Sequence, residues 1–189
     1  LSLHDALPIC HVSRLDGDRS LTAETLIDIW PQVRQVYPAA RLLIVGGGDR
    51  EEVSRGKAEA VNREAPGAVI LTGPRTDIPA LVSLGDVFVG ASRAVLEAMS
   101  AGLPALLSGN EGYMGVLTPE KLPGAMETNF CYRGYPMLRE EDLLEDLLDL
   151  LGRPTEWAEM GAFGRQVVLE HYSVDRMTDD YLAAYDRLL

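Results

Sequence analysis

Short apolar runs that alternate with segments of helical periodicity constrain the fold of this chain more than any other feature. Between the first two runs, Leu26, Trp30, Val33 and Tyr37 recur at i, i+4, i+7 and i+11, which places them on one helical face. Near-continuous apolar strands alternating with helices are typical of a parallel sheet covered on both faces. Such strands are predicted at 11–13, 41–45, 68–71, 86–89 and 104–107. The sequence therefore predicts a doubly wound parallel α/β domain of Rossmann-like architecture.

The remaining segments complete this domain and add a C-terminal helical tail. Thr22 is placed to cap the helix that follows residue 21, with Leu21 and Leu26 as a hydrophobic staple, and Pro31 should kink that helix. A glycine-rich loop is expected at 109–115. Further helices are predicted at 51–64, 77–84, 94–101, 140–151, 155–171 and 174–189, and a short sixth strand at 116–118.

Composition limits the classes of function. Apolar residues make up 47% of the chain, yet the longest apolar runs fall far short of the roughly 18 residues that a membrane helix needs, so no membrane span is expected. The net charge of −12 and the lack of a Lys/Arg cluster argue against nucleic acid as a partner. Two cysteines, Cys10 and Cys131, make no disulfide framework, no Cys/His cluster has metal-ligand spacing, and a reducing compartment is the default.

The first nine residues read as foreign to the protein. LSLHDALPI lacks an initiator Met and back-translates in frame as CTT TCC CTA CAC GAC GCT CTT CCG ATC, which looks like the end of a common sequencing adapter. We therefore interpret 1–9 as non-native, with a natural strand-like lead-in as the alternative, and 10–189 as the domain. Residues 1–9 should then pack poorly or extend the first strand only fortuitously, and an N-terminal half of the protein would be missing.

A ligand site is expected where the strand order of the sheet reverses. In open parallel sheets ligands bind beyond the carboxyl ends of the strands, which for the common order 3-2-1-4-5-6 means between the first and fourth strands. The loop after the first strand carries Arg14 and Arg19, and the loop after the fourth, GASR at 90–93, leads into a helix N-terminus. Arginines facing unpaired N–H groups predict a diphosphate site. Glu97, in the first turn of that helix, is placed to accept hydrogen bonds from ribose.

Each of these signals has a plainer interpretation. Arg14 and Arg19 can be solvated loop charges, and Glu97 can be an acidic residue that the helix dipole favours. The three glycines at 46–48 lack the G-x-G-x-x-G spacing of a dinucleotide site, and they are better suited to a strand-to-helix turn than to a phosphate. His11 and His171 are interpreted as structural or surface histidines. The functional interpretation rests on several weak signals that converge on one crevice.

The same segments resemble retaining GT-B glycosyltransferases of the group 1, family 4 type. VSRLDGDRS at 12–20 is similar to the family's V-G-R-L-x-x-x-K-G segment, and LLIVGGGDREEV at 42–53 to its L-x-I-V-G-x-G segment. VILTGPRTDIPALVSLGDVFVGASR followed by VLEAMSAGLPALLSG resembles the family block G-x-x-x-D-x-P-x-L-x-x-x-A-D-V-F-V…LEAMA-x-G-x-P. The match runs in order over 12–109, and it implies a GT-B C-terminal, donor-binding domain.

The resemblance also implies roles for individual residues. Arg14 and Arg19 would contact the donor phosphates and stabilise the departing nucleoside diphosphate, and Glu97 would hold the ribose. The segment 73–77 would border the base, and 110–114 would lie near the diphosphate and the sugar. The substrate-binding residues expected in this way are Ser13, Gly73, Ser92, Arg93, Glu97, Asn110, Glu111, Gly112 and Tyr113.

One departure from the family concerns the mechanism. The family's E-x7-E motif has an earlier glutamate eight positions before the residue matched by Glu97, and here that position is Val89 in a shortened loop. Ser92 or Arg93 would replace its role near the transferred sugar, or the chemistry differs. Arg19 stands where the family has lysine, which keeps the charge and adds a fork geometry suited to phosphate.

The resemblance implies transfer of a sugar from a nucleoside-diphosphate sugar to an acceptor hydroxyl, without a cofactor or metal. The acceptor, a glycan or a lipid, would bind through the missing N-terminal half, without which this chain would be inactive. The expected location is the cytoplasm, with the inner face of the membrane as the alternative for the full protein. The alternatives are a nucleotide-sugar 2-epimerase of the same fold and a non-catalytic nucleotide-binding module.

Overall fold

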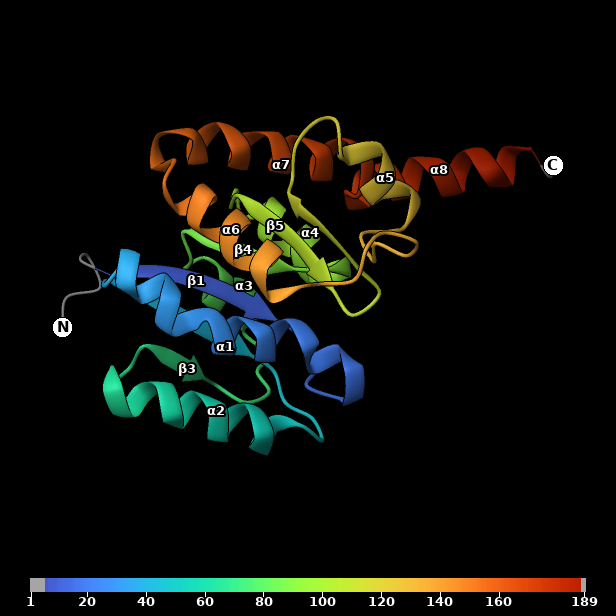
Figure 1. Ribbon diagram of the computed structural model, residues 1–189. Coiled ribbons are helices and arrows are strands. Elements are labelled where there is room, and N and C mark those ends of the chain that lie inside the picture. Colours follow the sequence, from blue (N-terminus) through green and yellow to red (C-terminus); the bar gives the residue numbers. More distant parts are fainter. Residues whose placement is uncertain (1–5, 188–189) are drawn as a thin grey trace.

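A six-stranded sheet forms the centre of the protein, which is described here from a computed structural model covering residues 6–187 (Figure 1). The order of the strands is β3-β2-β1-β4-β5-β6, and all neighbours are parallel except β5 and β6. The strands are β1 Leu7–Val12, β2 Ala40–Val45, β3 Val69–Leu71, β4 Val87–Gly90, β5 Ala105–Gly109 and β6 Gly112–Val116. The predicted parallel sheet, with the first and fourth strands adjacent, is confirmed.

Helices cover both faces of this sheet, as the near-continuous apolar strands predict. α1, α2 and α6 pack on one face, and α3, α4, α5 and α7 lie on the other. The helices are α1 Leu21–Val36, α2 Glu51–Glu64, α3 Ile78–Val82, α4 Ser92–Ser100, α5 Leu122–Glu127, α6 Glu140–Leu151, α7 Trp157–His171 and α8 Val174–Asp186, with 3-10 turns η2 Gly17–Ser20 and η3 Pro154–Glu156.

The two cores follow from the alternation of side chains along each strand. In β4, Val87 and Val89 belong to the core beneath α1 and α6, whereas Phe88 belongs to the core beneath α4. All three are fully buried. Successive residues of a strand point to opposite faces, so a strand that is covered on both sides must be apolar throughout. The predicted face of α1 is also buried, with Leu26 and Trp30 fully inaccessible to solvent.

Several local predictions differ from the structure. The segment 109–115 is not a loop, because β6 begins at Gly112 and forms a hairpin with β5; α5 was not predicted. Thr22 lies inside α1, and its Oγ1 is 3.0 Å from Ser108 Oγ in place of capping the helix. α1 continues through Pro31 as one helix. The helix predicted at 94–101 begins two residues earlier, at Ser92.

Part of the segment interpreted as foreign belongs to the central strand. Leu7 pairs with Ala40, and Ile9 pairs with both Leu42 and Val87. Ile9 is fully buried, so of the two expected outcomes the structure has an extension of the first strand and not poor packing. Residues 1–5 of that segment lie outside the described residues.

The C-terminal helix α8 contrasts with the rest of the domain. It extends beyond the sheet in Figure 1, and none of its residues is buried. Met177, Tyr181 and Tyr185 are each more than half exposed along it. Within residues 6–187, no helix has both the length and the apolar content that crossing a membrane requires. The predicted helices at 140–151 and 155–171 are present, the second beginning with a 3-10 turn.

Candidate functional site

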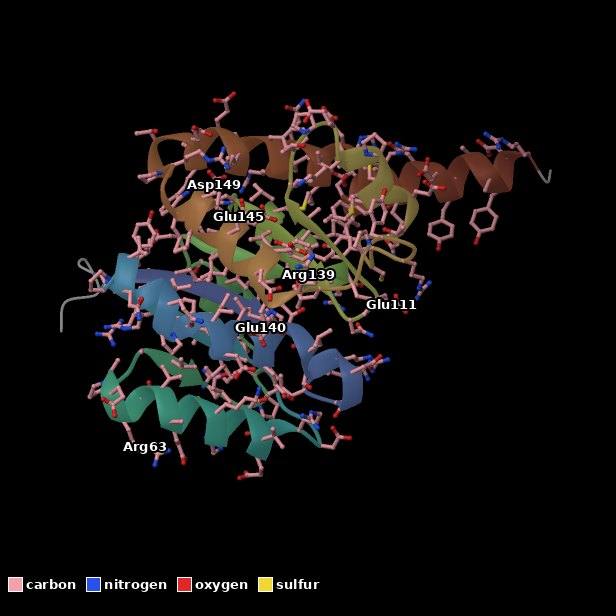
Figure 2. All side chains as sticks on the ribbon, in the orientation of Figure 1. Arg63, Glu111, Arg139, Glu140, Glu145 and Asp149 are labelled. Atoms are coloured by element: carbon pink, nitrogen blue, oxygen red, sulfur yellow. The ribbon has the colours of Figure 1, made fainter. Side chains whose placement is uncertain are left out.

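A cleft of about 900 Å³ opens at the carboxyl ends of β1 and β4, where the strand order reverses. This is the place that the topology of an open α/β sheet predicts for a ligand. Eight of the eleven residues proposed from the sequence line it: Ser13, Arg14, Arg19, Ser92, Arg93, Glu97, Asn110 and Glu111. Figure 2 labels one of them, Glu111, at this end of the molecule, with Arg63 of α2 at the opposite end.

The wall of the cleft formed by residues 13–20, which we call the β1 wall, carries cations without partners. Arg14 and Arg19 are exposed, and neither side chain has a hydrogen bond or an ion pair with any of the described residues. The backbone beneath them is fixed, because Leu15 is fully buried and its N–H donates to the Gly47 carbonyl at 3.0 Å. Two guanidinium groups are thus held on a rigid base and left available to an anion.

The glycines that follow β2 explain how this wall is held. Gly46 has φ of +144°, and a Cβ at that position would overlap the Ser13 carbonyl. Gly48, at φ +159°, would likewise collide with the Leu15 carbonyl. The glycines therefore allow two loops to approach each other closely, as well as forming the turn expected from the sequence, although Gly46 and Gly47 also line the cleft.

The opposite wall, which we call the α4 wall, consists of Ala91 and the first two turns of α4. Ser92 adopts φ of +54°, unusual for a residue with a side chain, and its N–H donates to the Phe130 carbonyl at 2.6 Å. The N–H groups of Arg93 and Ala94, next along the helix, have no partner within the described part of the chain. Unpaired N–H groups at a helix start attract anions.

Glu97 lies on the same wall, and its place differs from the prediction. Because α4 begins at Ser92, its first turn holds no acidic residue, and Glu97 follows one turn later. The dipole effect falls off within the first turn, so the interpretation of Glu97 as a dipole-favoured acid loses its main support. The carboxylate pairs with Arg93, whose Nε lies 2.8 Å from Oε1, and about a third of the Glu97 side chain is exposed.

Two further polar pairs lie at the mouth of the cleft. Asn110 Nδ2 donates to Asp18 Oδ2 at 3.1 Å, which joins the β5–β6 turn to the β1 wall. Glu111 accepts from Arg133 Nε at 2.7 Å, and this contact holds the pKa of Arg133 above its usual range. Both side chains that the sequence proposed here, Asn110 and Glu111, are thus engaged with protein partners.

Three proposed residues do not line the cleft. Gly73 contributes its carbonyl to a backbone bond from Gly46, while its neighbours Pro74 and Arg75 line the cleft instead. Gly112 packs directly against the Tyr132 carbonyl. Tyr113 is turned toward α6, where its hydroxyl donates to Asp146 Oδ2 at 2.6 Å and burial raises its pKa.

Sequence reasoning missed the polar floor of the cleft. His11 is 2% exposed, and its Nδ1 and Nε2 each lie 2.8 Å from a partner, the Val89 carbonyl and Ser13 Oγ respectively. Burial disfavours the imidazolium and lowers the pKa of His11 to about 4. Thr22 and Ser108 form a second buried pair. The only sequence signal was a histidine in an apolar strand, which is ambiguous until the neighbours of the strand are known.

The position of the absent family glutamate is also explained. Val89 is fully buried in β4, and its carbonyl accepts from His11. Val89 does not line the cleft, whereas Ser92 and Arg93 do. Among residues 6–187, no group of three or more His, Cys, Asp or Glu side chains is arranged to hold a metal ion.

Comparison with known proteins connects this cleft to a family. The family model described as glycosyl transferases group 1 matches residues 7–131, which include both walls. Among curated proteins, none matches the sequence significantly. The match covers more than half of the chain, and it shows family membership.

Solved structures share the fold at low sequence identity. HepE from Anabaena, in complex with UDP and glucose, superimposes with a TM-score of 0.71 at 18% identity, covering 98% of this chain and 49% of that one. TarM from S. aureus superimposes with a TM-score of 0.67 at 19% identity, covering 97% of this chain and 37% of that one. The catalytic domain of the cholesterol-α-glucosyltransferase from Helicobacter pylori superimposes with a TM-score of 0.59 at 16% identity, covering 87% of this chain and 99% of that one. The chain thus spans less than half the length of the HepE and TarM chains that it matches. The chain belongs to the group 1 glycosyltransferases, and its six-stranded domain is the Rossmann-like domain of the GT-B fold.

Proposed function

We propose that this chain is the donor-binding part of a glycosyltransferase and that its cleft binds a nucleoside-diphosphate sugar. The observation that carries the proposal is the placement of Arg14 and Arg19, unpaired among the described residues, opposite the open N-terminus of α4. The chain has a net charge of −12, so an anion is held here only if local groups outweigh the overall repulsion. Two free guanidiniums and the N–H groups of Arg93 and Ala94 supply that local attraction.

Glu97 is assigned to the ribose in this proposal. Its carboxylate accepts hydrogen bonds, and without ligand it accepts one from Arg93. Arg93 is 89% exposed, so the pair is weak and is readily replaced by ribose hydroxyls.

The chemistry proposed for the whole protein is sugar transfer to an acceptor hydroxyl. Arg14 and Arg19 would stabilise the negative charge that develops on the departing nucleoside diphosphate, which is the largest charge formed in the reaction. The acceptor, a glycan or a lipid, would be positioned by a further domain, and orientation of this kind supplies several kcal/mol of the barrier. We place this activity in the cytoplasm, at the inner face of the membrane if the acceptor is a lipid. HepE and the pneumococcal O-GlcNAc transferase GtfA have been solved with UDP, which supports a nucleotide in the cleft.

Calorimetric titration of the 189-residue chain tests the proposal. The ligands are UDP, GDP, ADP and pyrophosphate, and the variants are Arg14→Ala and Arg19→Ala. Each variant should weaken the binding of all four ligands alike, by about 1.5–3 kcal/mol, because each arginine is proposed to contact phosphate. Arg63→Ala is the matched control, since Arg63 is exposed at the far end of α2 and should leave binding unchanged (Figure 2). Binding that survives both cleft substitutions would show that the arginines are solvated loop charges.

A second experiment tests the division of labour between domains. The chain should bind the donor but transfer no sugar to glycan or lipid acceptors, since in this proposal a further domain positions the acceptor hydroxyl. Transfer by the isolated chain, followed with a labelled nucleotide sugar, would contradict the proposed need for an acceptor domain. Conversion of the sugar to its 2-epimer would favour the epimerase alternative.

A further inference from the structure

The floor of the cleft contains a chain of three groups whose hydrogen-bond directions are fixed. His11 Nδ1 lies 2.8 Å from the Val89 carbonyl, and Nε2 lies 2.8 Å from Ser13 Oγ. A carbonyl oxygen only accepts, so Nδ1 must carry the proton in this contact. At its lowered pKa of about 4, His11 is neutral near pH 7 and holds a single ring proton. Nε2 is therefore a bare acceptor, and the Ser13 hydroxyl must donate to it.

This arrangement has a consequence for the cleft, because a serine hydroxyl has one proton and two lone pairs. Once the proton points at His11, only the lone pairs of Ser13 Oγ remain for a ligand. We propose that Ser13 is a specificity-determining acceptor, oriented by His11, that selects a hydroxyl of the transferred sugar and rejects a phosphate oxygen at this point of the cleft. This inference rests on the donor-binding function proposed above.

The neighbouring groups divide the cleft into two kinds of surface. Arg14, Arg19 and the open N–H groups of α4 can only donate, and they suit the oxygens of a diphosphate. Ser13 Oγ and the Glu97 carboxylate can only accept, and they suit hydroxyls. Thr22 and Ser108, the other buried hydroxyl pair, lie 3.0 Å apart, and either oxygen can be the donor, so that pair imposes no direction. His11 is what distinguishes Ser13 from these hydroxyls, which makes it a positioning residue.

The direction of the hydrogen bonds from Ser13 through His11 to Val89 can be measured directly in the free protein. Nitrogen-15 NMR of the imidazole, assigned by the signal lost in His11→Gln, should show the tautomer protonated at Nδ1 at pH 7. The opposite tautomer, or a His11 that carries two protons at pH 7, would overturn the proposal regardless of any binding result.

Binding experiments test what the fixed direction does. The probes are pyrophosphate, UDP, GDP and ADP, and the glucose, galactose and N-acetylglucosamine conjugates of whichever nucleotide binds best. Ser13→Ala should lose the preference for at least one conjugate over its nucleotide by about two- to tenfold, the range of one neutral hydrogen bond, and leave pyrophosphate unchanged. Ser83→Ala, which removes an exposed hydroxyl at the C-terminal end of α3 that does not line the cleft, is the control and should alter neither.

Substitutions of His11 separate orientation from structural support. His11→Asn keeps a donor near the Val89 carbonyl but removes the partner of Ser13, so the freed hydroxyl should bind pyrophosphate more tightly while the preference for the sugar falls. His11→Gln keeps an acceptor near Ser13 and should stay close to the parent. A purely structural role predicts equal losses for all ligands in both variants.

The outcomes also distinguish this inference from the proposed function. If Arg14→Ala abolishes pyrophosphate binding while Ser13→Ala changes no conjugate, or weakens pyrophosphate, the donor site stands and the role of Ser13 is refuted. If the parent binds none of the probes, both proposals fail.

Discussion

The two walls of the cleft differ in the charges and hydrogen-bond donors that they present to a ligand. The β1 wall presents Arg14 and Arg19 as free charges on a backbone fixed by buried contacts. The α4 wall has its charges already paired, as Arg93 and Glu97, and supplies backbone N–H groups beside a residue at positive φ. Affinity for an anion should therefore come mainly from the β1 wall. The side chains of the α4 wall should contribute to binding only when a ligand displaces the contact between Arg93 and Glu97.

The largest expected effect concerns the floor beneath the β1 wall. His11 has a folded pKa of about 4 against about 6.5 when unfolded, so the unfolded chain binds a proton first as pH falls. The stabilisation from neutral His11 is complete above pH 6.5 and is lost between pH 6.5 and 4, by about 3 kcal/mol. Denaturant unfolding of the parent and of His11→Gln across this interval measures it, and the parent should show the steeper loss. Parallel curves would mean that His11 titrates normally.

The next effect compares arginines on the two walls. Arg14→Ala should weaken pyrophosphate by about 1.5–3 kcal/mol, because the charge that it removes is free. Arg93→Ala should change it by no more than about 0.5 kcal/mol, since Glu97 already offsets that charge and the backbone N–H remains. Calorimetry on both variants decides the matter, and equal losses would remove the asymmetry between the walls.

Glu97→Gln should give a smaller, selective effect. The amide still accepts a hydrogen bond but without charge, so ribose-bearing ligands should weaken by about 1 kcal/mol. Pyrophosphate should bind unchanged or slightly more tightly, since a nearby negative charge is gone. Titration of UDP against pyrophosphate measures the difference, and a uniform loss across both would mean that Glu97 acts only through Arg93.

The smallest effect concerns the backbone of the α4 wall. Ser92 has φ of +54°, where glycine avoids the steric cost of a side chain but loses more chain entropy. Ser92→Gly should therefore stabilise the fold by about 0.5 kcal/mol. Ser100→Gly, in the last helical position of α4, should destabilise it by a similar amount. Denaturation midpoints of the pair test this prediction, which fails if both variants lose stability.

Sequence periodicity was enough to predict the part of the fold that positions the cleft. The helices predicted at 51–64 and 140–151 coincide with α2 and α6, and the predicted strands overlap β1 to β5, because both signals are local. The first strand was predicted only at 11–13 because the first half of β1 lies in the segment interpreted as foreign. The sixth strand was predicted at 116–118, whereas β6 spans Gly112–Val116, because this segment contains two glycines and reads as a turn until it pairs with β5. The early start of α4 was missed because it depends on Phe130, whose carbonyl holds Ser92 from a distant part of the chain.

The candidate site shows the same division. Arg14, Arg19 and Glu97 could be assigned to one crevice because their motifs lie beside strand ends, and all three line one cleft. The role of His11 depends on Val89, a partner 78 residues away, and on the direction of a single proton. Gly112 and Tyr113 were assigned to a loop, but strand alternation turns Tyr113 toward α6. Positions beside strand ends could be placed from chain order and the common strand order, whereas side-chain directions that depend on contacts between distant segments of the chain could not.

The central position of β1 also determines when the cleft can come into being. β1 precedes the other five strands of the sheet in the chain, yet it lies between β2 and β4 in the finished sheet. Its β2 side can pair early, whereas its β4 side stays open until a partner far along the chain arrives, and contacts of such long separation form slowly. The hydrogen bond that orients His11 joins β1 to β4, so it forms only when β4 pairs with β1. The direction of the Ser13 hydroxyl is therefore set only once β4 has joined β1, whereas the loop that carries Arg14 and Arg19 is held by its contacts with the segment that ends β2.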